Sequence, residues 1–98
     1  MPRTIEKPCN PQDWVQRAAY CQDLTPAQFR FLVMASELAR IDIELCLPSL
    51  ESMSCHFAAV GHYVPVAAHA MSLMAAGWLY DDPLHKGLVL TFPVWTHD

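Results

Sequence analysis

Apolar side chains recur at helical spacing in several stretches of this chain, and the first two stretches begin with clear capping residues. Asn10 precedes a proline at the first helical position, which predicts a short helix over 11–22. Thr25 also precedes a proline and has Gln28 three positions on, so a capping box opens a helix over 26–40. The predicted inner face of this second helix consists of Ala27, Phe31, Met34, Ala35 and Leu38.

The middle of the chain predicts a short strand and two further helices. Apolar and polar residues alternate over 41–47, which is typical of a half-buried strand, and Pro48 ends the pattern. Ser49 caps the helix that follows. A last helix is expected over 65–76, because Gly77 is a typical residue for the position just past a helix end.

The C-terminal third has the pattern of a β-hairpin. Strands are predicted over 78–80 and 88–92, joined by a loop over 81–87. The fold class is therefore mainly α with a small β-hairpin, an α+β domain that has an extra helix at its N-terminus. We expect an N-terminal arm over 1–9, a single domain over 10–92 and a C-terminal tail over 93–98.

Composition favours a folded, acidic domain. The chain is 53% hydrophobic and 16% charged, with a net charge of −4. This is too apolar for a disordered tail, and the acidity argues against tight non-specific DNA binding. We expect a cytoplasmic protein with reduced thiols and no membrane partner, since the sequence shows neither a secretion signal nor a membrane-spanning stretch.

The stretch "LPSLESMSCHF…VAAHAMSLMAAGWLYDDP…GLVLTF" resembles the winged helix-turn-helix superfamily. In particular, it is similar to small helix-turn-helix regulators and replication-protein domains of phages and plasmids. Residues 73–78 fill the phrase that ends the third helix of that family before its hairpin, the wing. The resemblance covers residues 24–92 and implies a DNA-binding regulatory protein that acts as a dimer.

The helix over 65–76 lacks the residues that read DNA bases. Its predicted inner side carries Val66, Ala70 and Leu73. The residues predicted to face outward are Ala67, Ala68, Met71, Ser72 and Ala75. Bidentate base readout needs Arg, Lys, Asn or Gln, and none of these is present on that side. An apolar face of this kind is also typical of a protein interaction site.

Other candidate contacts lie in the turn and at the wing tip. His62 and Tyr63 in the turn could touch DNA or a partner, or could simply be exposed. His85 and Lys86 at the predicted wing tip could meet a phosphate backbone, although two aspartates beside them oppose this.

Three apolar residues of the first two predicted helices lie outside the inner face described above. Trp14, Phe29 and Val33 are expected either to pack the N-terminal helix onto the domain or to form a homodimer contact.

Catalytic and metal-binding patterns are absent from the sequence. No close Cys pair suits zinc, and adjacent Cys55 and His56 point to different sides of a helix. We expect neither an enzyme nor a cofactor, metal or small-molecule substrate. Two functions remain: a DNA-binding regulator of mobile-element type with weak base readout, or a winged-helix module that binds a host or mobile-element protein complex and not DNA.

Overall fold

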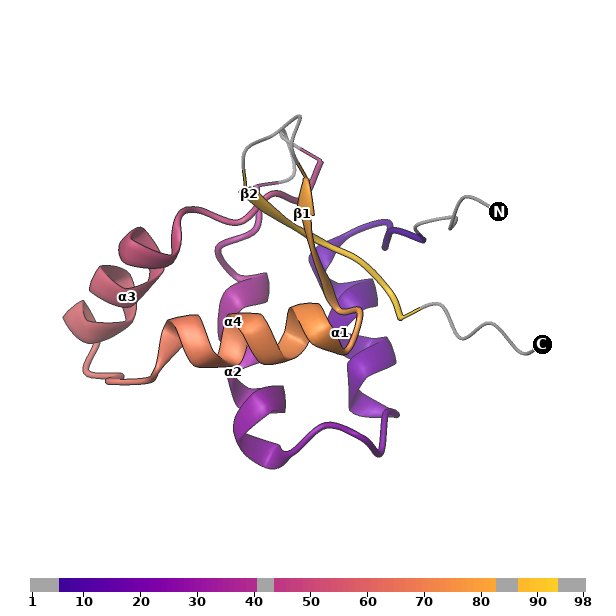
Figure 1. Cartoon of the computed structure of the whole chain (residues 1–98), viewed down its shortest axis with the longest axis horizontal. Helices are drawn as coiled ribbons and strands as arrows, with labels where there is room; N and C mark the ends of the chain where they lie inside the picture. The colour runs from indigo at the N-terminus through magenta and orange to yellow at the C-terminus, as the bar shows by residue number, and fades with distance from the viewer. Residues whose placement is uncertain (1–5, 41–43, 83–86, 94–98) are drawn as a thin grey trace.

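The computed structural model describes residues 6–40, 44–82 and 87–93. Within them the chain forms four helices and one antiparallel hairpin, a small α+β arrangement as predicted. The elements are α1 (Pro11–Ala19), α2 (Pro26–Ser36), α3 (Leu50–Ala59), α4 (Val66–Ala75), β1 (Leu79–Asp82) and β2 (Gly87–Leu90). Helix α4 crosses α2, with α3 next to its start and α1 on the other side of the molecule (Figure 1). None of the helices in these ranges is long and apolar enough to span a bilayer.

The predicted helix starts are confirmed by their hydrogen bonds. The Asn10 side chain accepts from the Asp13 amide at 2.8 Å, and Ser49 caps α3 through the Ser52 amide. Thr25 and Gln28 form the complete capping box of α2. Such caps satisfy amides that have no partner within the helix, so local sequence alone fixes these boundaries.

Helices α1 and α2 end earlier than predicted. Helix α1 ends at Ala19 and not at 22, and α2 ends at Ser36 and not at 40. The Ser36 hydroxyl donates to the Val33 carbonyl at 2.6 Å, so it competes for an oxygen that a continuing helix would use. The residues after α1 are needed to reverse the chain toward Thr25, because α1 and α2 pack together.

The predicted strand over 41–47 is wrong for the residues that the structure describes; residues 41–43 lie outside them. Glu44 and Leu45 have φ values of 49° and 62°, the left-handed region, which is incompatible with an extended strand. Only Cys46 makes strand-like bridges, one to Arg40 and one to Val89. Leu45, Cys46 and Leu47 are all buried, so the alternation of inner and outer residues fails. Tertiary packing along β2 has overridden the local pattern.

Helices α3 and α4 end in the same way, each with a glycine at the position after its cap. Gly61 and Gly77 have φ values of +86° and +90°. In α4 the Trp78 amide donates to the Leu73 carbonyl at 2.8 Å, and the His62 amide makes the equivalent bond after α3. This is the Schellman arrangement, in which the left-handed residue is usually glycine.

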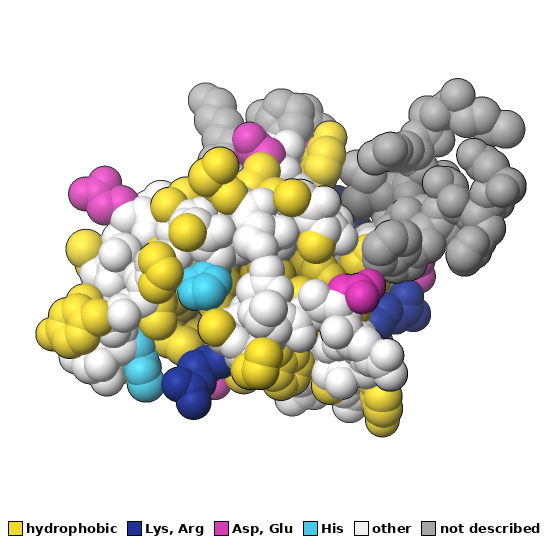
Figure 2. Space-filling view, turned by 60° about the horizontal axis from the view of Figure 1, so that its bottom comes forward, with side chains coloured by type: hydrophobic (Ala, Val, Ile, Leu, Met, Phe, Trp, Pro, Cys, Tyr) yellow, Lys and Arg dark blue, Asp and Glu magenta, His cyan; other side chains and the backbone are white. Residues whose placement is uncertain are grey.

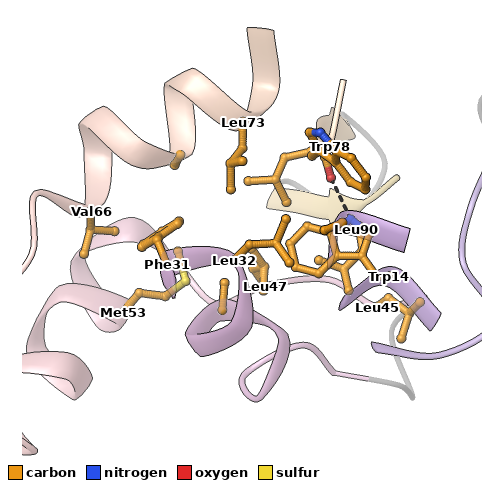
Figure 3. Close-up of a cluster of buried hydrophobic side chains, with 14 of the residues drawn as sticks. Trp14, Phe31, Leu32, Leu45, Leu47, Met53, Val66, Leu73, Trp78 and Leu90 are labelled. Carbon is orange, nitrogen blue, oxygen red and sulfur yellow. Dashed lines mark hydrogen bonds between the residues drawn. The ribbon is translucent and has the colours of Figure 1, made fainter. Parts of the chain in front are cut away.

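The hairpin joins the helical layer through Trp14. Register pairs Leu79 with Leu90, and both side chains are buried. The indole Nε1 of Trp14 donates to the carbonyl oxygens of Trp78 and Thr91, at 3.1 Å and 2.9 Å. Figure 3 shows the first of these bonds beside the cluster of buried side chains.

The core draws side chains from all the described elements. Helix α2 buries the adjacent residues Phe31 and Leu32, although only Phe31 was predicted to face inward. Both are buried because α2 packs against α1 and against α4. Leu32 lies between Phe31 and Trp14 in Figure 3.

Candidate interaction surface

The solvent-facing side of α4 is entirely apolar. We name the α4 outer face by its exposed residues: Ala67, Ala68, Met71, Met74 and Ala75. Met71 is its most prominent member, with 67% of its surface exposed. Figure 2 shows hydrophobic and uncharged side chains spread over this side of the molecule, with charged side chains mostly toward its margins. Large apolar side chains on a helix normally face the core, so an exposed apolar helix face is unusual surface.

Ser72 does not belong to this face. Its hydroxyl accepts a hydrogen bond from the Gln28 side-chain amide, and the contact is partly buried between α4 and α2. Gln28 holds that position because its other side-chain atom closes the capping box with Thr25. The prediction that Ser72 stands outward is corrected. Met74, which is 36% exposed, takes part in the exposed face.

The turn before α4 extends the exposed surface. His62 and Tyr63 are both exposed, and Tyr63 shows 84% of its surface. Val60, at the end of α3, is 59% exposed. The wing-tip residues His85 and Lys86 lie outside the described residues.

Most of the described cations are already engaged. Lys7 pairs with Glu44 at 3.2 Å, and Arg17 pairs with Glu6 at 3.5 Å. Arg40 also interacts within the chain. Helix α4 itself contains no Lys or Arg.

The three residues predicted to pack the N-terminal helix or a dimer are separated by the fold. Trp14 is fully buried in this chain, so it offers no surface to a second copy. Phe29 is half-buried and packs against the core. Val33 is also half-buried, and its carbonyl accepts the Ser36 hydroxyl.

An open groove of about 370 Å³ lies between α2, the connection before α4 and the first turn of α4. Its apolar lining is Pro26, Ala27, Phe31, Met34 and Val64. Arg30 and His69 provide its polar groups. The helical spacing predicted Ala27 and Met34 on the inner face of α2, but Ala27 is exposed and Met34 is half-buried. No spacing rule indicated this groove, because its residues come from separate elements.

Among the described residues, no group of three or more His, Cys, Asp or Glu could hold a metal ion. Free thiols occur at Cys9, Cys21, Cys46 and Cys55. Only Cys46 is buried. Burial raises the pKa of the Cys46 thiol, and nearby Asp82 raises it further, against a smaller opposing effect of Arg40.

We expect Cys46 to react with iodoacetamide at least about tenfold more slowly than Cys55 in the native protein, because the thiolate is the reactive form. The raised pKa also means that the unfolded thiol ionises first. The contribution of the Cys46 thiol to the free energy of unfolding is therefore fully present below pH 9.0, the pKa of the unfolded thiol. It is lost as the pH rises through the higher pKa of the folded state. Mass spectrometry of each labelled cysteine at pH 8 measures the rates, with denatured protein as the control. Equal native rates would contradict this assignment.

No protein-family model, curated protein or solved structure matches this chain.

Proposed function

We propose that this chain is a small protein-binding module of winged-helix type, which docks on a partner protein through the α4 outer face. The observation that carries the proposal is the composition of that face, where each exposed side chain is Ala or Met. Burying the exposed 67% of Met71 against a partner is worth about 1–2 kcal/mol. Methionine also adapts its shape to irregular partner surfaces.

The order of elements supports the winged-helix part of the proposal. Helix α2 is followed by the segment around Cys46, which bridges β2, then by α3, α4 and the hairpin. The Leu47 amide donates to the Leu88 carbonyl at 2.7 Å, so this segment, although not a regular strand, lies along β2 where a winged helix has its first short strand. Helix α1 is then an addition that Trp14 fastens to the hairpin.

The chemistry of α4 favours a protein over DNA as the partner. A helix in the major groove needs bidentate side chains for the bases and cations for the phosphates. The exposed side of α4 has neither, and Ser72 is occupied by Gln28. A DNA-binding regulator remains the second candidate, favoured by the element order alone.

Replacing Met71 with glutamate is expected to weaken partner binding by about 100-fold, because a carboxylate would be buried against an apolar surface. Tyr20→Glu is the matched control, since Tyr20 is 89% exposed and lies after α1. The measurement is quantitative co-purification of the tagged full chain from cells of its source, followed by titration of the recovered partner with both variants.

Three outcomes would count against the proposal. A partner held equally by Met71→Glu and wild type would bind elsewhere. Self-association that only Met71→Glu abolishes would assign the α4 outer face to a dimer of this chain. Duplex DNA binding in a mobility-shift titration, weakening steeply with salt, would favour the regulator instead.

A further inference from the structure

The groove beside α4 combines an apolar floor with two polar side chains, Arg30 and His69, that make no side-chain hydrogen bond or ion pair with the described residues. The ring of His69 stacks on Phe31, with centroids 5.3 Å apart and planes 24° apart. This contact fixes the imidazole at the edge of the groove, where it makes no hydrogen bond with any described residue. Figure 2 shows hydrophobic side chains between histidine and a basic side chain on this side of the molecule.

Arg30 is the unpaired cation in the part of the chain that the structure describes. Lys7, Arg17 and Arg40 each interact within the chain, whereas Arg30 has neither an ion pair nor a hydrogen bond there. It is exposed on α2, one turn after Pro26, so the positive end of the α2 dipole lies nearby. In a chain of net charge −4, an arginine left free at the rim of a groove is available to an external anion.

We infer that this groove binds an acidic peptide segment that carries a bulky apolar side chain. The apolar side chain would lie over Met34 and Val64, which are half-buried, and an adjacent carboxylate would accept hydrogen bonds from Arg30. The neighbouring His69 adds a further donor. A single free cation over an apolar floor suits such a peptide better than a nucleic acid, which requires several phosphate contacts.

The inference rests on the proposed function only in taking the segment to belong to a protein partner. The groove and the α4 outer face are separate surfaces, so variants can fail independently. Met71→Glu tests the outer face, while Arg30→Ala tests the groove.

The experiment is a titration of the isotope-labelled full chain with two peptides, followed by amide chemical shifts. The acidic probe is acetyl-Asp-Leu-Phe-Glu-Asp-amide, and its neutral counterpart is acetyl-Asn-Leu-Phe-Gln-Asn-amide. We expect the acidic probe to shift the amides of Arg30, Met34, Val64 and His69, and to bind at least about fivefold more tightly than the neutral one.

Arg30→Ala should reduce the affinity for the acidic probe to that for the neutral probe. Lys7→Ala removes a positive charge outside the groove and should leave the affinity unchanged. Equal affinities for the two probes, equal effects of the two substitutions, or no shift at millimolar peptide would overturn the inference. Shifts confined to Met71 and its neighbours on the α4 outer face would do the same and would leave the proposed function standing.

Discussion

Replacing Trp14 with alanine is expected to lower the free energy of unfolding by about 4 kcal/mol, the range measured for large aromatic residues in protein cores. Trp14 is fully buried and touches the core from α1. The substitution leaves a cavity between α1 and the hairpin, and it removes the donor that bonds two main-chain carbonyls. Chemical denaturation followed by circular dichroism measures the loss.

Trp14→Phe separates the two contributions. Phenylalanine keeps most of the apolar contact but has no Nε1 to donate to Trp78 and Thr91. We expect a loss of about 1–3 kcal/mol, because the Thr91 carbonyl loses its hydrogen bond, whereas the Trp78 carbonyl still accepts from the Thr91 amide at 3.1 Å. If Trp14→Phe unfolds at the same denaturant concentration as the wild type, the two hydrogen bonds do not hold α1 on the hairpin.

The sequence predicts the helix starts and stops well because those signals are local. Asn10, Thr25 and Ser49 each act on an amide within three residues, and the bonds form as expected. Gly77 is another local signal, since its left-handed φ ends α4 at the predicted place. The hairpin is confirmed, but its strands are Leu79–Asp82 and Gly87–Leu90. Asp81, Asp82 and Gly87, which were predicted in the loop, lie in the strands, because Asp81 pairs with Leu88 and Asp82 with Gly87.

The errors arise where distant residues decide the conformation. Alternation over 41–47 predicted a strand, but the left-handed Glu44 and Leu45 turn the chain so that Cys46 meets Val89. Ser72 was placed outward because its reach to Gln28, 44 positions away, is invisible in a helical pattern. Tertiary contacts override local propensity at both places.

The candidate site was foreseen in part. The sequence indicated the apolar character of α4, because the exposed alanines and Met71 follow from helical spacing. The groove could not be foreseen. The binding site proposed there depends on an arginine without a partner. Arg30 is recognised as that arginine only when the structure shows that Lys7, Arg17 and Arg40 interact within the chain.

The glycines that end α3 and α4 give the second large prediction. Gly77→Ala is expected to destabilise the protein by about 2–3 kcal/mol, whereas Gly61→Ala costs about 1 kcal/mol. Both residues have nearly the same positive φ, so the backbone strain and the gain from a stiffer unfolded chain are similar in the two variants. The difference is the surroundings: a Cβ on Gly77 lies 3.1 Å from the Pro93 Cα, and one on Gly61 meets nothing within 4 Å.

The crowding at Gly77 cannot be relieved by moving the two segments apart without breaking bonds. The Thr91 hydroxyl donates to the Gly77 carbonyl at 2.8 Å, and the Phe92 amide donates to the main-chain carbonyl of Glu6 at 2.9 Å. These bonds hold Pro93 against the end of α4, so the added methyl must displace main chain and not a flexible side chain. Denaturant midpoints of the two variants measure the difference, because the strain common to both cancels. Equal midpoints would mean that the segment around Pro93 moves away freely, and that the end of α4 is not fixed by its contact with Pro93.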